Sequence, residues 1–193
     1  NDTLTGGAGD DSFILSDGAV LPGVINGSGG SNTLDLGAYT TARDVILTGL
    51  GSVNGFAGTE TSLGRFDNVR KILGSTSNLD SITGMDAPAT FTVNATNVLY
   101  TSTNTLTFSG FEYVHGGGEA DRFDFMAYNT QVREFLGGAG DDVFALHANV
   151  PVWGKINGQG GTDLLDYSAY TAGGVTVDLA AATADGIYGG LVG

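Results

Sequence analysis

Two copies of a glycine-rich segment carry the residues best suited to chemistry. The first copy reads GGAGDDSF over residues 6–13, and the second reads GGAGDDVF over residues 137–144. Glycines permit backbone angles that a side chain forbids, so that carbonyl oxygens can converge on one point. The second aspartate of each copy, Asp11 or Asp142, adds a carboxylate beside them. Because Ca²⁺ prefers carboxylate and carbonyl oxygens, each segment predicts a calcium-binding turn.

Further segments keep part of this pattern, namely residues 1–5, 27–34, 116–123 and 158–165. Asp2 lies nine residues before the aspartate of the first full copy, Glu119 stands where a glycine belongs, and Asn32 stands at an aspartate position. We expect the calcium ligands to be the acidic or amide side chains and the glycine carbonyls of these turns. The predicted ligands are Asp2, Gly7, Gly9, Asp11, Asn32, Gly117, Asp121, Gly138, Gly140, Asp142, Gly160 and Asp163.

The full segments resemble the nonapeptide G-G-x-G-x-D-x-U-x of the RTX (haemolysin-type) family of secreted calcium-binding repeat proteins. Residues 6–14 and 137–145 match the nonapeptide completely. The resemblance implies a calcium-loaded β-solenoid in a large secreted bacterial protein. It also implies a chain that stays loose at low calcium and folds after export.

A longer repeat contains these segments. An offset of 131 residues superposes 6–13 on 137–144 and continues through Ile25 on Ile156 and Tyr39 on Tyr170. Residues 6–58 are therefore equivalent to 137–190, and self-similarity of this kind indicates a solenoid or an array. We interpret residues 1–193 as a single β-solenoid, cut from a longer array of such modules.

A shorter period sets the expected fold. The motif positions 11 and 32 are 21 residues apart, as are positions 121, 142 and 163. Runs of β-branched and aromatic residues separate the turns, and helical periodicity is not evident. These features predict an all-β, right-handed parallel β-helix, similar to a β-roll, with coils of about 21 residues. We expect one row of glycine–aspartate turns, and a protruding loop over residues 51–64.

Composition narrows the function. The 193 residues include 21 acidic and 7 basic side chains, for a net charge of −14, and no cysteine. This charge disfavours nucleic acid and anionic membranes as partners, and it suits cations. Without cysteine there is neither a disulfide nor a thiolate zinc site. No apolar run is long enough to cross a membrane, so we expect no transmembrane segment.

Stacked acidic turns explain why calcium would matter. Two carboxylates about 5 Å apart repel each other by about 3 kcal/mol at an effective dielectric constant of 20. A calcium ion between successive turns would convert this repulsion into coordination, and folding would depend on the metal. Extracellular calcium sites have dissociation constants of roughly 10⁻⁴ to 10⁻³ M.

Other readings of the polar residues stay open. Aspartate in a glycine turn can instead bond its own backbone, and this is the expected role of Asp80. Glu112, Tyr113 and His115 could belong to a polysaccharide-active enzyme, although the sequence shows no partner that would orient a base. His147 and Lys155 are isolated and interpreted as surface residues.

The sequence thus predicts a non-catalytic, calcium-stabilised structural module of an extracellular adhesin, stalk or filament. Its expected partners are calcium, neighbouring repeats through end-to-end assembly, and a cell-surface or polysaccharide ligand. The alternative is a calcium-binding β-helix module of a polysaccharide-active secreted enzyme or toxin. A secreted, extracellular or cell-surface location follows from either reading.

Overall fold

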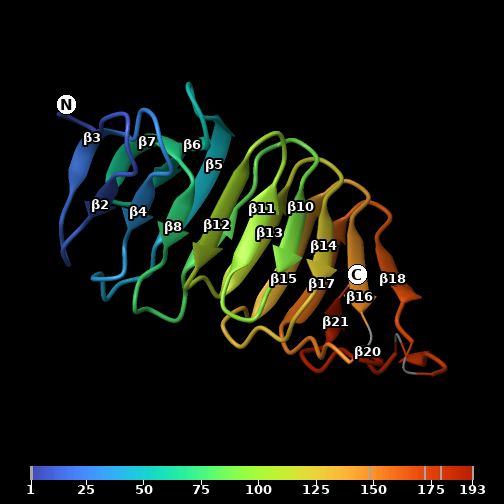
Figure 1. Ribbon diagram of the computed structural model, residues 1–193. Helices are drawn as coiled ribbons and strands as arrows, with labels where there is room; N and C mark the ends of the chain where they lie inside the picture. The colour runs from blue at the N-terminus through green and yellow to red at the C-terminus, as the bar shows by residue number, and fades with distance from the viewer. Residues whose placement is uncertain (1, 148, 172, 179, 193) are drawn as a thin grey trace.

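The computed structural model describes residues 2–147, 149–171, 173–178 and 180–192. These residues form strands and turns without a helix, which confirms the predicted all-β class. Two large sheets face each other along an elongated body, with the N-terminal strands at one end and the last strands at the other (Figure 1). No helix in the described ranges has the length and apolar character to cross a membrane.

The first large sheet has ten strands among the described residues. In spatial order they are β1 (Thr3–Thr5), β3 (Leu21–Asn26), β7 (Leu63–Val69), β6 (Phe56–Glu60), β5 (Asp44–Leu50), β9 (Ser81–Thr83), β13 (Tyr113–Gly117), β15 (Glu134–Ala139), β17 (Lys155–Gly160) and β21 (Leu191–Val192).

The second large sheet has nine strands in the same part of the chain. In spatial order they are β18 (Leu164–Ala169), β16 (Val143–His147), β14 (Arg122–Phe125), β10 (Thr90–Val93), β11 (Val98–Thr101), β12 (Thr105–Ser109), β8 (Lys71–Leu73), β4 (Thr33–Asp35) and β2 (Ser12–Ile14). A small antiparallel pair joins β19 (Val177–Asp178) to β20 (Thr183–Ala184).

Most neighbouring strands are parallel, and their registers repeat the spacing read from the sequence. In the nine-stranded sheet, Phe123 of β14 pairs with Phe144 of β16, which pairs with Leu165 of β18. Each partner lies 21 residues further along the chain. From β1 to β18, apart from β5–β7 and β10–β12, consecutive strands belong to alternate sheets, so turns into one sheet lie at one edge of the body and turns into the other sheet lie at the opposite edge.

The core fills the space between the two sheets. Side chains alternate along each strand, so every second residue points inward. Phe91, Phe123 and Phe144 stack face to face, with ring centroids 4.6 Å and 4.9 Å apart. Parallel in-register strands place equivalent residues above each other, and this is why one aromatic position recurs as a stack.

Two antiparallel meanders interrupt the parallel order, so both large sheets are mixed. Strands β5, β6 and β7 form one meander, and β10, β11 and β12 form the other. The first contradicts the predicted loop over residues 51–64, because Phe56–Glu60 is a strand paired on both sides. The segment FAGTE lacks a strong strand pattern, and its neighbours in the sheet impose the extended conformation.

The two meanders lie at the same level of the body and pack against each other. The ring of Phe56 from β6 lies 5.2 Å from that of Tyr100 from β11. Beside them, the Asn104 side chain donates a 2.7 Å hydrogen bond to the Gly55 carbonyl oxygen. Each sheet gains two extra strands at this level. The strands of the two sheets therefore still face each other on both sides of the meanders.

The phenylalanine stack gives a test of the core. Replacing a buried phenylalanine by alanine costs about 3 to 5 kcal/mol. We expect Phe123→Ala, in the middle of the stack, to lower the free energy of unfolding by that amount in urea titrations. Phe13→Ala, at a half-buried equivalent position near the end of the body, should cost clearly less. Equal losses would contradict a core that is tightest in the middle.

Candidate functional site

Three of the predicted acidic ligands meet in one column. Asp121, Asp142 and Asp163 directly precede β14, β16 and β18, three parallel neighbours in the nine-stranded sheet. The backbone N–H of Asp121 donates to Asp142 Oδ1 at 2.8 Å, and that of Asp142 donates to Asp163 Oδ1 at 3.1 Å. The 21-residue spacing therefore brings these side chains together, with each carboxylate bonded to the preceding turn.

The turns also bond their own carboxylates. Gly117 N–H donates to Asp121 Oδ2 at 2.7 Å, and Gly7 N–H donates to Asp11 Oδ2 at the same distance. Asp121 Oδ1 accepts a further bond, from Ala89 N–H at 2.8 Å. This is the backbone-bonding role that the sequence left open, and it aims the carboxylates inward. Each carboxylate oxygen keeps a second lone pair, so this role is compatible with metal binding.

Asp142 differs from its neighbours. Its side chain is completely buried, and its Oδ2 has no hydrogen-bond partner among the described residues. A Cβ built on Gly137 would clash with this oxygen and would lie 2.5 Å from the Gly158 carbonyl oxygen. A negatively charged oxygen and a carbonyl oxygen of the next turn thus face the same small space. Burying such an oxygen without a partner is costly, and a cation suits the position.

The predicted glycines keep neighbouring turns close. Gly138 and Gly140 have φ angles of 111° and 106°, which only glycine adopts readily. A Cβ on Gly138 would clash with the Gly117 carbonyl oxygen, and one on Gly160 would lie 3.6 Å from the Gly138 carbonyl oxygen. These glycines therefore let the backbones of successive turns approach each other closely. In contrast, a Cβ on Gly7 or Gly9 would meet no atom within 4 Å.

The N-terminal turns form a weaker version of the site. Asp11 N–H donates to Asn32 Oδ1 at 3.0 Å, which repeats the contact between the later turns. The Asn32 amide donates to the carbonyl oxygens of Gly29 and Asn68, both at 2.9 Å, so hydrogen bonds already occupy this side chain. Asp2 precedes β1 of the ten-stranded sheet, so it lies at the opposite edge from Asp11.

A second column runs along that opposite edge, which contradicts the expectation of a single row. Asp80 precedes β9 of the ten-stranded sheet, and its Oδ1 accepts the Arg43 N–H at 2.8 Å. Asp80 N–H in turn donates to Glu112 Oε2 at 2.9 Å. Ser75 N–H donates to Asp80 Oδ2 at 2.5 Å, so Asp80 is the turn-former that the sequence predicted. Glu112 takes the place of an aspartate in this column. The 21-residue spacing of the motif aspartates did not predict this role.

Burial dominates the electrostatics of the acidic column. Desolvation, with a smaller contribution from the nearby Asp142 charge, raises the pKa of Asp121 to about 7. Desolvation, with a smaller contribution from the Asp163 charge, likewise raises the pKa of Asp142 to about 6. Backbone N–H donors oppose both shifts. Without a cation, Asp121 and Asp142 therefore hold protons at a pH where free aspartates are ionised.

Comparisons with known proteins give this chain no relative. No protein-family model, no curated protein and no solved structure matches it. The function must therefore be argued from the geometry of the chain itself.

The other candidate polar residues make ordinary surface contacts. Tyr113 and His115 share the outward face of β13, as the alternation predicts, and burial lowers the pKa of His115. His147 Nε2 lies 2.7 Å from Asp124 Oδ1, and Lys155 Nζ lies 3.0 Å from Glu134 Oε1. Both contacts bridge neighbouring strands on the outside of a sheet.

The raised pKa values predict how stability depends on pH without metal. The folded protein holds the protons of Asp121 and Asp142 more tightly than the unfolded chain does, so protonation favours folding. This contribution is complete below the usual pKa of 3.8 and is lost as the pH rises through about 6 and about 7. With a chelator present, we expect a higher melting temperature at pH 5 than at pH 8.

Asp142→Asn gives the control for this prediction. The amide cannot ionise, so the difference in melting temperature between pH 5 and pH 8 should become smaller. Asp35→Asn should leave the difference unchanged, because Asp35 lies outside both columns and its Oδ1 accepts the Gly37 N–H at 2.9 Å. A wild-type melting temperature that is equal at both pH values, or higher at pH 8, would contradict the predicted protonation.

Proposed function

We propose that this chain is a calcium-stabilised structural module of an extracellular adhesin, stalk or filament. The observation that carries the proposal is the column of Asp121, Asp142 and Asp163, with one buried and unpartnered carboxylate oxygen on Asp142. A divalent cation would neutralise the column and fill the coordination of that oxygen. The match of residues 6–14 and 137–145 to the RTX nonapeptide supports calcium as the cation.

The residues fit a calcium site in their chemistry, because carboxylate and carbonyl oxygens are the ligands that Ca²⁺ takes. Carboxylate oxygens of Asp121, Asp142 and Asp163 would bind calcium between successive turns, together with the carbonyl oxygens of glycines in adjoining turns, such as Gly137 and Gly158. Backbone N–H groups fix the carboxylates in place before the ion arrives. The metal would supply charge neutralisation and cross-linking of neighbouring turns, and the proposal involves no reaction.

The proposed architecture is a right-handed parallel β-helix with coils of about 21 residues. The 21-residue steps between paired strands β14, β16 and β18 support it, as does the alternation of the chain between two sheets. Crossovers between parallel strands are right-handed in nearly all proteins. In this description the two meanders are insertions into an otherwise regular winding.

A role outside the cell follows from the calcium requirement. Sites with dissociation constants of roughly 10⁻⁴ to 10⁻³ M fill only at extracellular calcium concentrations. The 131-residue repeat supports a place in a longer array, where neighbouring modules stack end to end. Exposed apolar residues occur in the strands at both ends of the body, including Ile14, 70% exposed, and Leu164, 54% exposed. Such strand edges favour pairing with another chain or module.

Calcium titration tests the proposal. Protein stripped with EGTA should gain about 1.4 to 2.7 kcal/mol of stability per site in 10 mM calcium, given dissociation constants of about 10⁻³ to 10⁻⁴ M. We expect the melting temperature, followed by far-UV circular dichroism, to rise with calcium and to rise much less with magnesium, which demands tighter octahedral geometry.

Asn variants assign the effect to the column. Asp142→Asn should remove most of the calcium-dependent stabilisation, whereas Asp35→Asn should keep it, because the latter changes a turn outside both columns. A wild-type melting curve that does not move between zero and 10 mM calcium would refute the proposal.

A further inference from the structure

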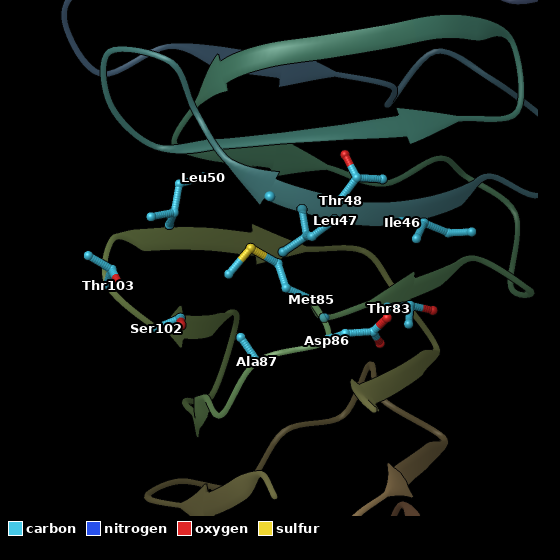
Figure 2. Close-up of a pocket in the computed structure, with 12 residues that line it drawn as sticks. Ile46, Leu47, Thr48, Leu50, Thr83, Met85, Asp86, Ala87, Ser102 and Thr103 are labelled. Carbon is cyan, nitrogen blue, oxygen red and sulfur yellow. The ribbon is translucent and has the colours of Figure 1, made fainter. Parts of the chain in front are cut away.

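A groove of about 590 Å³ lies between the two meanders. Strand β5 forms one wall, the segment after β9 forms the opposite wall, and the β11–β12 turn closes the end (Figure 2). The buried side chains of Leu47 and Met85 make the floor, and Thr48, Ser102 and Asp86 line the sides. Its volume is in the range of ordinary ligand sites.

One wall of the groove is an unpaired strand edge. On β5, strand β9 pairs with Asp44, Val45 and Ile46 alone, the first three residues of that strand. After Thr83 the chain turns away, and Gly84 N–H donates to β13 instead. The edge of β5 from residue 47 to residue 50 therefore faces the groove without a neighbouring strand.

The same stretch of β5 carries a β-bulge. The register between β5 and β6 shifts between Leu47 and Gly49, and Thr48 has no partner in β6. Bulges re-aim side chains and are frequent beside functional sites. A Cβ on Gly49 would meet no atom within 4 Å, so the groove is open at this point. Ile46 and Leu50, on either side, are 42% and 43% exposed.

We propose that this groove binds an extended peptide segment that carries a lysine or arginine, by adding it as a strand to the free edge of β5. Free N–H and C=O groups along a strand edge repeat at the spacing of a peptide backbone, so main-chain hydrogen bonds supply the affinity. Ile46 and Leu50 flank the edge and contact alternate side chains of the added strand.

The negative charge of the groove and of the whole chain favours a cationic peptide. Asp86 is exposed on the groove wall, and no Lys or Arg is among the described residues that line the groove. The whole chain carries a net charge of −14, so a cationic segment is attracted from a distance. The groove also lacks an aromatic lining residue in the described ranges, and aromatic faces are what would favour a sugar ring over a peptide.

The groove is separate from the proposed calcium sites. It lies beside the meanders, where the column of acidic turns is interrupted. The segment after β9 and the β11–β12 turn border the edge, and a single extended strand is the occupant that we propose.

Fluorescence anisotropy with labelled pentapeptides tests the proposal. The probe is acetyl-Thr-Val-Lys-Val-Thr-amide, and the comparison peptide has the same sequence with an N-methyl group on every backbone nitrogen. We expect the first peptide to bind folded protein in calcium buffer and the N-methylated peptide to bind at least about tenfold more weakly, because it cannot donate to β5. Equal binding of the two peptides, or no binding of either at millimolar concentration, overturns the proposal.

Two variants place the peptide in the groove. Gly49→Phe fills the open space and should abolish binding, whereas Gly174→Phe, at a glycine whose Cβ would also meet no atom within 4 Å, should not affect it. If circular dichroism shows that the Gly49→Phe variant does not fold, the Asp86→Lys variant, which changes an exposed side chain, tests the proposal instead. That change should weaken binding of the Lys peptide by about two- to fivefold or more and favour a Glu peptide instead.

A sugar ligand is the remaining outcome. Binding of a neutral or acidic oligosaccharide that is lost in Gly49→Phe, with no binding of the peptide, would overturn the peptide assignment and make the groove a saccharide site. Unchanged peptide binding in both Gly49→Phe and Asp86→Lys would show that the peptide binds elsewhere, and would equally overturn it.

Discussion

The hydrogen bond from the backbone of one turn to the carboxylate of the next turn is the contact on which the rest depends. It joins Asp121 to Asp142 and Asp142 to Asp163, and a similar bond joins Asp80 to Glu112 at the other edge. These bonds hold successive turns in one register, and the register stacks Phe91, Phe123 and Phe144 in the core. The same contact draws acidic groups into the interior, where burial makes protons or a cation necessary for their stability.

The sequence predicts those parts of the structure that depend on regular spacing. The 21-residue step between Asp121, Asp142 and Asp163 equals the register of the paired strands, so the column could be found by counting. Counting could not show which sheet a turn leads into, and for this reason the sequence did not predict the second column, which contains Asp80 and Glu112. It also missed β6, because Phe56–Glu60 is held as a strand by β5 and β7 and not by its own composition.

The meanders connect the two proposed roles of the chain. On one side of them lie the turns around Asp121, Asp142 and Asp163, and on the other side lie the turns around Asp11 and Asn32. At the level of the meanders, the column of acidic turns is interrupted. The groove beside β5 lies there in place of a regular turn. Regular winding supplies rigidity, and the irregular insertion supplies a place where another molecule can be recognised.

The matched level of the two meanders has a consequence for the history of the chain. Each insertion adds two strands to its own sheet, and Phe56 packs against Tyr100 across the core where they meet. A hairpin added to one sheet alone would leave that sheet two strands longer than its neighbour, and every turn beyond it would be displaced from its partner. The hairpins in the two sheets therefore depend on each other, and a shorter homologue is expected to lack both or to keep both.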